Sequence, residues 1–332
     1  MNIIEATSPK FSASWAHLCS QCEWRHALYG TINLRFYKAY FSVEFTDRSI
    51  VVIGNTPLAG LRVTSHVDER GATNFSSFGQ PSLYIEHRAS GVQARRKAYV
   101  MIKSYVGEML SKAGAWQWEH AEHLAGGAIS PFGRHLLSLG GVPVVATTQM
   151  IDLGKETDTL FSDLSKSFRW SVNWGRKNLA LRVIDGSNIQ MADVEAFHAL
   201  HVEAAGRETR SAATWQIQHE MVLGNEAFIC AAYLDGRLVT AALFPYSPEH
   251  CYYGVSASRR ELFEKPLSHV LLWQAICHAR SLGCCWFEMG DIQYPYQAPP
   301  PLAEGAFHQH FQAWIRREYD GTPPYQRNRA VH

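Results

Sequence analysis

Five residues in the C-terminal half of the chain could transfer protons or bind anions. Tyr252 and Tyr253 are neighbours in a predicted strand, so their phenols point to opposite faces and only one can meet a substrate. Glu288 and Asp291 come at the end of a later predicted strand, and Lys265 directly precedes a predicted helix. Phenols and carboxylates can act as general acids or bases, and a lysine can neutralise negative charge. The sequence therefore predicts these five as candidate catalytic residues.

Four arginines and one glycine complete the candidate site. Arg207 and Arg210 share a polar loop that enters a helix, where they form either an anion site or ordinary salt bridges. Arg259 lies shortly before the next helix, and Arg169 lies on the basic side of an earlier helical region. Gly254 interrupts a strand, which indicates a bulge, a close approach of ligand to backbone, or a packing requirement. We predict that these five residues bind the substrate or donor.

The elements that must position these residues run from Ala227 to Asp291. Short apolar and β-branched runs predict three strands, and Asp235-Gly236 between the first two is typical of a tight hairpin. Helical spacing begins after Pro266 and ends at Gly283, before a last buried strand. A strand that follows a crossover helix should lie parallel to the strand before that helix. The order strand, strand, strand, helix, strand thus predicts that the strands containing Tyr253 and Phe287 are parallel.

That order resembles the core of the GNAT N-acyltransferase superfamily, and in particular its FemABX branch of peptidoglycan-bridge aminoacyltransferases. The resemblance covers about half of the chain and is carried by these stretches: Phe197 to His201 with Ala205 to Ser211, Ala227 to Phe244, Glu261 to Leu267, and Phe287 to Asp291. Lys166 to Arg169 also resembles a stretch that links the two units of FemABX proteins. The resemblance implies an α/β (mixed α+β) fold of tandem GNAT-like units, each a mixed twisted sheet flanked by helices. It also implies that the parallel strands containing Tyr253 and Phe287 diverge and leave backbone donors unpaired between them.

The expected division places an N-terminal GNAT-like unit at 1–152 and a helical linker region at 153–178. A C-terminal GNAT-like acyltransferase unit follows at 179–321, and a mobile tail at 322–332.

The resemblance also implies the reaction, namely transfer of an aminoacyl or other acyl group to an amine on a peptide, cell-envelope precursor or small metabolite. Aminoacyl-tRNA is the favoured donor, because the stretch Ser258 to Pro266 lacks the glycines with which coenzyme-A-dependent GNAT proteins hold a pyrophosphate. Two alternatives stay open: an acyl-CoA or carrier thioester as donor, and a non-catalytic binding protein with this fold. We expect no tightly bound cofactor, and the sequence does not decide the oligomeric state.

Within such a site each candidate has an expected role. Lys265 and Arg259 would neutralise phosphate or developing negative charge, and the loop arginines would hold an anionic part of donor or acceptor. Tyr252 or Tyr253 would donate a proton to the leaving group. Glu288 or Asp291 would accept the amine proton, directly or through water.

The N-terminal half gives weaker expectations. Thr31 to Phe45 and Arg48 to Val67 read as strands, and Val92 to Ala113 as the clearest helix of this half. A further helical region is expected from about Glu156 to Arg176.

We predict no metal site. The Cys19-x-x-Cys22 pair has no second closely spaced pair, and His198 and His201 have no matching carboxylate or cysteine in sequence.

The composition is that of a globular protein. The chain has 332 residues, 46% of them apolar and 18% charged, with a formal net charge of +1. Such a charge gives no overall attraction to nucleic acid, although a local basic groove stays compatible with it. No apolar run approaches the ~20 residues of a membrane span, and Met1 to Lys10 lacks the features of a signal peptide. We therefore expect a cytoplasmic protein without a membrane span.

Overall fold

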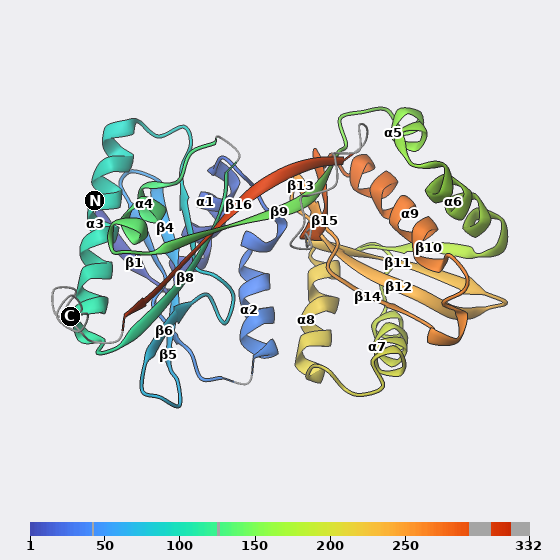
Figure 1. Ribbon diagram of the computed structural model, residues 1–332, viewed down its shortest axis with the longest axis horizontal. Helices are drawn as coiled ribbons and strands as arrows, with labels where there is room; N and C mark the ends of the chain where they lie inside the picture. The colour runs from blue at the N-terminus through green and yellow to red at the C-terminus, as the bar shows by residue number, and fades with distance from the viewer. Residues whose placement is uncertain (42, 125–126, 292–306, 320–332) are drawn as a thin grey trace, which may run out of the picture. The chain divides into compact units, whose positions relative to one another are not determined.

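The computed structural model describes residues 1–41, 43–124, 127–291 and 307–319, with backbone alone for 145–147, 291 and 307–319. The chain forms two compact units, each described by itself below (Figure 1). Of the described residues, the first contains those within 1–24, 41–146 and 311–319, and the second those within 25–40, 147–291 and 307–310. Each unit is therefore built from separate stretches of the chain, whereas the sequence suggested that one unit follows the other. The expected mobile tail at 322–332 lies outside the described residues.

In the first unit, an antiparallel sheet has the order β1-β3-β4-β7. Its strands and the two helices against it are β1 (Asn2–Glu5), β3 (Ile50–Ile53), β4 (Pro57–Arg62), β7 (Leu83–Glu86), α1 (Phe11–Gln21) and α3 (Val92–Lys112). Gly60 of β4 faces α1, where a Cβ would lie 2.9 Å from the side chains of Trp15 and Leu18. Its neighbours Ala59 and Leu61 belong to the core that α3 completes on the other face. The predicted helix at Val92 is confirmed.

A second group of strands in this unit pairs in the order β2-β5-β6-β8-β16. The strands are β2 (Thr46–Asp47), β5 (Thr64–Val67), β6 (Thr73–Ser76), β8 (Trp116–His123) and β16 (Phe307–Tyr319). The pair β6–β8 is parallel and the other pairs are antiparallel. Helix α4 (Pro131–Ser138) begins at Ser130, whose hydroxyl accepts a hydrogen bond from the Gly133 N–H.

In the second unit, an antiparallel sheet has the order β10-β11-β12-β14. Its strands are β10 (Ala180–Ile184), β11 (Ala227–Leu234), β12 (Arg237–Pro245) and β14 (Val255–Ser258). Asp235 and Gly236 join β11 to β12 with positive φ values of 49° and 77°, as a type I′ hairpin requires. A further set of strands comprises β13 (His250–Tyr252), β15 (Trp286–Asp291) and the end of β9 (Val142–Asp152).

Two layers of helices cover the sheet β10-β11-β12-β14, one on each face (Figure 1). One face packs against α5 (Thr157–Asp163), α6 (Lys166–Asn178) and α9 (Leu267–Ser281), and the other against α2 (Thr31–Tyr40), α7 (Met191–Ala205) and α8 (Ala212–Leu223). Strand β11 supplies both cores in alternation, because Phe228 and Cys230 enter the first while Ala227 and Ile229 enter the second. Burial on both faces explains why β11 reads as a continuous apolar run.

Three expectations need correction. Thr31 to Phe45 is no strand: residues 31–40 form α2, which packs against α8 with Ile32 in the shared core. The helical region from Glu156 to Arg176 is two helices, because Ser165 caps a new helix through its hydroxyl and the Phe168 N–H. The strand expected around Gly254 is also two strands, β13 and β14.

Among the described residues, no helix combines the length and the apolar character needed to cross a membrane.

Candidate functional site

The centre of the site is a fork between two parallel strands of the second unit. Strand β13 pairs with β15 over three residues, from His250 opposite Trp286 to Tyr252 opposite Glu288. The Tyr253 N–H then donates to the Glu288 carbonyl at 2.9 Å, and the next N–H, of Gly254, donates to Leu243 on β12 at 3.1 Å. The chain thus leaves β15 for β12 at this point, and β14 pairs with β12 instead. The predicted pair of parallel, diverging strands is present.

Gly254 lies where the chain changes partner. A Cβ at this position would stand 3.0 Å from the Leu243 carbonyl oxygen and 3.1 Å from Cδ of Pro245. The absence of a side chain therefore lets β14 approach β12 closely. Of the three readings of this glycine in the sequence, the contacts support close packing of two strands.

Strand β14 leads from the fork to a hollow in front of α9. The hollow has a volume of about 370 Å³ and is lined by residues that include Ser258, Lys265 and His269. Two aromatic side chains also line it, Trp170 of α6 and Phe263 of the preceding loop, and these are 63% and 66% exposed. Helix α9 follows Pro266 without a side-chain cap, so its first N–H groups face this region. Lys265 is exposed there, and none of the described side chains forms an ion pair with it.

The loop around Lys265 uses much of its own hydrogen-bonding capacity. The N–H groups of Leu262, Phe263, Lys265 and Leu267 all donate to carbonyls within the loop. The Arg259 N–H donates to Val239 on β12. Few backbone donors are left in this loop to surround a pyrophosphate.

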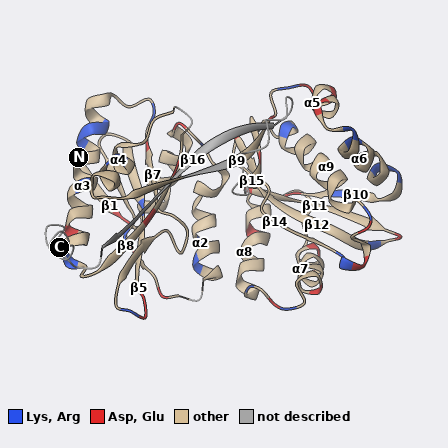
Figure 2. Ribbon diagram, in the orientation of Figure 1, with Lys and Arg blue, Asp and Glu red and all other residues tan. Residues whose placement is uncertain are grey.

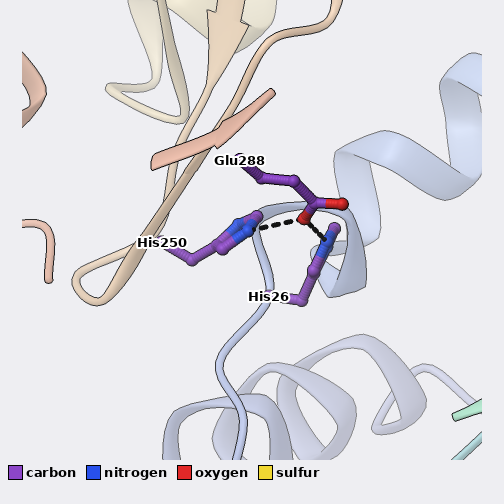
Figure 3. Close-up of side chains that lie close together, drawn as sticks. All are labelled: His26, His250 and Glu288. Carbon is purple, nitrogen blue, oxygen red and sulfur yellow. Dashed lines mark hydrogen bonds and ion pairs between the residues drawn. The ribbon is translucent and has the colours of Figure 1, made fainter. Parts of the chain in front are cut away.

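A buried carboxylate stands behind the fork (Figure 3). Glu288 is 2% exposed, and its Oε2 lies 2.9 Å from Nε2 of His26 and 2.8 Å from Nε2 of His250. The Thr148 hydroxyl lies 2.7 Å from Oε1 and also 2.9 Å from the Gly290 carbonyl. His26 and His250 are 7% and 1% exposed, and their rings stack with centroids 4.1 Å apart. We call His26, Thr148, His250 and Glu288 the Glu288 cluster.

The electrostatics of this cluster oppose a role for Glu288 as a base. Burial alone would raise the pKa of Glu288, but electrostatic attraction to His26 and hydrogen bonds from His250 and His26 outweigh it. The pKa of Glu288 is therefore strongly lowered. A carboxylate that is held ionised by three donors has little tendency to take a proton from an amine.

The two tyrosines face different surroundings. Tyr253 stacks against Phe244 in the core shared with α9, and its hydroxyl donates to Oγ of Ser256 at 2.8 Å. Tyr252 lies on the other face, where its ring centroid is 6.1 Å from that of His26. Asp291 ends β15 with its backbone opposite Thr148, and its side chain lies outside the described atoms.

Three of the predicted binding arginines have protein partners. Arg169 donates to the carbonyls of Ser162 and Leu164 at the end of α5. Arg259 pairs with Glu203 at 2.5 Å and donates to the Leu238 carbonyl. Arg210 lies 3.2 Å from Nε2 of His201 and 4.9 Å over the ring of Trp215, and burial lowers its pKa. Arg207 is exposed and forms no ion pair with the described side chains.

Sequence reasoning missed three members of the Glu288 cluster. His26 lies between two apolar segments, Thr148 in a strand that reads as buried, and His250 beside a turn, so none of them carries a local signal. His198 lies outside this cluster: its Nε2 is 2.9 Å from Oε1 of Glu208, and its ring stacks on Trp215.

The chain is similar to one family model and to several solved structures. A family model described as acetyltransferase (GNAT) domain matches residues 169–298. The crystal structure of FemX aligns over 100% of both chains with a TM-score of 0.68 and 12% identity. L-PGS from Bacillus licheniformis aligns over 94% of this chain and 93% of its own, with a TM-score of 0.58 and 10% identity.

A tandem GNAT protein from the clavulanic acid biosynthesis pathway also aligns, over 97% of this chain and 98% of its own, with a TM-score of 0.53 and 14% identity. No curated protein sequence matches the chain significantly. The resemblance and the α/β fold expected from the sequence are thereby confirmed. Residues 169–298 thus match the model of the GNAT acetyltransferase domain family, and the chain as a whole has the fold of FemX.

Proposed function

We propose that the second unit transfers an acyl group to an amine, with the acyl carbonyl held in the fork between β13 and β15. The observation that carries this proposal is the short parallel pair that separates after Tyr253 and Glu288. Separated strands present backbone donors to a bound carbonyl, where they stabilise the negative charge that develops during attack. The GNAT match over residues 169–298 supports the same reaction.

The donor enters from the hollow in front of α9 in this proposal. Strand β14 has four residues and joins the hollow to the fork, a distance of about 13 Å at the usual rise per residue. A donor whose acyl group is carried on an extended arm would reach from one to the other. Lys265 neutralises the anionic part of the donor at the hollow, and the uncapped end of α9 adds a favourable dipole.

Aminoacyl-tRNA is the donor that we favour. Helix α6 carries four basic residues and no acidic one. Blue segments mark this basic character along α6 in Figure 2. Trp170 and Phe263 offer exposed rings on which an unpaired nucleobase can stack. The loop after Ser258 also keeps few backbone N–H groups free for a pyrophosphate. These three features fit the end of a charged tRNA better than coenzyme A.

The chemical step needs two proton transfers. The amine attacks the carbonyl carbon, a C–N bond forms and the ester C–O bond of the donor breaks. The amine nitrogen loses a proton, and the departing alkoxide oxygen gains one to become a hydroxyl. We assign that proton to Tyr253, because it lies on the same face of the sheet as α9. Asp291 is our candidate acceptor for the amine proton, since Glu288 is already saturated with donors.

A thioester donor is the second candidate. The tandem GNAT protein of the clavulanic acid pathway was crystallised "without AcCoA", and it shares the fold of this chain. The decisive experiment incubates the protein with a charged tRNA or with acetyl-CoA, together with amine acceptors, and identifies products by mass spectrometry. Transfer from charged tRNA alone is expected. Transfer from acetyl-CoA alone would overturn the donor assignment, and no transfer from either would favour a binding protein.

Variants of Lys265 test the donor hollow. Replacement by alanine is expected to raise KM for the donor about tenfold while kcat changes less, because a contact to donor phosphate is lost. Lys38→Ala is the matched control, since Lys38 is an exposed lysine of the same unit that lies on α2, outside both the hollow and α6. Equal effects of both variants would contradict the assignment.

The aromatic pair is tested in the same way. Trp170→Ala and Phe263→Ala should each weaken donor binding by about 1 to 3 kcal/mol if a base stacks there. Leu282→Ala serves as control, because Leu282 is also an exposed apolar residue of this unit but lies outside the hollow. A thioester donor without a stacked base would leave binding unchanged in both aromatic variants.

A further inference from the structure

The Glu288 cluster has the composition of a metal site. His26, His250 and Glu288 each offer a ligand atom, and these atoms lie within 4.8 Å of one another. Two histidines and a carboxylate are a common ligand set for zinc. The hydrogen bonds around the rings decide whether the nitrogens are available.

Both imidazoles receive a backbone N–H at Nδ1. The Leu28 N–H donates to Nδ1 of His26 at 3.0 Å, and the Ala27 N–H donates to Nδ1 of His250 at 3.2 Å. A backbone amide can only donate, so neither Nδ1 can carry a proton in this arrangement. A neutral imidazole then carries its proton on Nε2, and both Nε2 atoms point at the same oxygen of Glu288. Each ring therefore links a backbone donor to the carboxylate.

Metal binding would require the opposite arrangement. A zinc ion bound to Nε2 would use the lone pair of that nitrogen, so the proton of the neutral ring would be on Nδ1. That proton would then face the backbone N–H of Ala27 or Leu28. Histidines that bind metals normally donate their second N–H to an acceptor. The nitrogens also lie 2.8 and 2.9 Å from the carboxylate oxygen, closer than the separation of about 3.3 Å between ligands around a tetrahedral zinc.

We propose that the Glu288 cluster is a proton-ordered clamp, with both imidazoles in the Nε2–H form, that fixes the start of the segment Arg25–Tyr40 at the fork. His250 lies on β13 and Glu288 on β15, so one carboxylate oxygen joins His26 to both strands where they separate. His26, His250 and Thr148 are positioning residues, and they withhold Glu288 from proton transfer. Only that last consequence rests on the proposed function.

Neighbouring contacts hold the same segment. The Arg25 carbonyl accepts from the Ser247 hydroxyl at 2.5 Å, and the Arg25 side chain pairs with Glu249. Within the segment, Asn33 donates to the Ala27 carbonyl at 3.1 Å. The backbone that supplies the Ala27 and Leu28 amides is thus fixed from several directions, which keeps these donors aimed at the two rings.

The proton positions can be measured directly. In the full-length protein labelled with ¹⁵N-histidine, long-range ¹H–¹⁵N spectra distinguish Nε2–H, Nδ1–H, doubly protonated and metal-bound imidazoles. At pH 7 we expect His26 and His250 as Nε2–H, unchanged by one equivalent of zinc. An Nδ1–H form of either ring, or stoichiometric zinc binding that shifts both, would overturn the clamp.

Two substitutions of His250 test the hydrogen bonds at its two ring nitrogens one at a time. In His250→Asn the side-chain oxygen can replace Nδ1 as acceptor of the Ala27 N–H, whereas in His250→Gln the side-chain amide can replace Nε2 as donor to Glu288. Hydrogen exchange of the Ala27 amide should accelerate about tenfold in His250→Gln and much less in His250→Asn. Equal acceleration in both would contradict the proposed order of protons.

The corresponding pair at His26 reports on the Leu28 amide and keeps the test decisive if a His250 variant does not fold. Acyl transfer is assayed separately. Loss of transfer with the proton order intact would count against the proposed function and leave the clamp standing, whereas a reversed proton order with transfer intact would do the opposite.

Discussion

The two units each bury a histidine beside a glutamate, but the partners of the histidines differ. In the first unit, His120 lies between Oγ of Ser82, 3.0 Å from Nδ1, and Oε1 of Glu122, 2.9 Å from Nε2. In the second unit, His26 and His250 have backbone N–H groups at Nδ1. A hydroxyl can donate or accept, whereas a backbone N–H only donates. Nδ1 of His120 can therefore carry a proton, whereas Nδ1 of His26 and Nδ1 of His250 cannot.

The carboxylates differ in what they hold. Glu122 accepts from the backbone N–H of Ser130 at 2.7 Å and from its hydroxyl at 2.5 Å, so it supports the start of α4. Glu288 holds two imidazoles from distant parts of the chain instead. Burial alone would raise the pKa of Glu122, but the hydrogen bond and charge of His120 and the hydrogen bonds of Ser130 lower it overall. Both carboxylates are thus stabilised as anions. Glu122 holds the N-terminal residue of a nearby helix, whereas Glu288 holds two segments that are far apart in the sequence.

Removing either carboxylate should cause the largest loss in the free energy of unfolding. Glu288→Met and Glu122→Met keep the volume but leave buried N–H donors without an acceptor, at a cost of about 3 to 5 kcal/mol. Hydrogen exchange in each unit measures the loss locally, because the two units need not unfold together. The exposed Glu195 supplies the control Glu195→Met. If one carboxylate proves dispensable, the parallel between the two networks fails.

Glutamine replacements should cost less, about 2 kcal/mol, and separate the two networks more sharply. In Glu122→Gln the new amide can donate to Nε2 of His120, whose proton moves to Nδ1 and towards the Ser82 hydroxyl. In Glu288→Gln the amide can turn to the Thr148 hydroxyl, which then donates to the Gly290 carbonyl. We therefore expect ¹⁵N spectra to show a change of tautomer for His120 and none for His26 or His250. A change in the latter pair would contradict the contrast.

Local patterns predicted the elements around the fork. Asp235-Gly236 gave the hairpin, and the crossover helix between the strands of Tyr253 and Phe287 gave their parallel direction. Both depend on short-range rules of chirality and turn geometry. Residues 31–40 were misread because their aromatic and β-branched composition suits a strand, and only packing against α8 makes them a helix.

The Glu288 cluster lay beyond such reasoning. His26 and Glu288 are 262 residues apart, and their meeting depends on the return of residues 25–40 to the second unit. A buried glutamate in a strand must have hydrogen-bonding partners, but the sequence does not indicate which residues these are. Arg259 shows the converse: its position before α9 suggested an anion site, and Glu203 on α7 supplies the anion instead.

A smaller effect is expected at Thr148. Thr148→Val removes one donor to Glu288 at nearly constant volume, at a cost of about 1 kcal/mol. Thr148→Ser keeps the hydroxyl and serves as the matched control. Exchange of the Ala27 and Leu28 amides should respond to valine and not to serine. If serine and valine behave alike, the methyl group and not the hydroxyl holds this position.

The smallest effect is the change in the stability penalty of the Glu→Gln variants between pH 7 and pH 5, which should be the same for Glu288 and Glu122. The pKa of each is lower in the folded chain than the value of about 4.3 for an unfolded glutamate, so folding favours the ionised form. This contribution is complete above the unfolded pKa and is lost as the pH falls through the folded pKa. The penalty of each Glu→Gln variant should therefore stay constant from pH 7 to pH 5 and shrink only below about pH 4. Stability curves of wild type and variants against pH, read from each unit separately, measure this. A penalty that already changes between pH 7 and pH 6 in the second unit alone would contradict the fixed proton order on which the contrast rests.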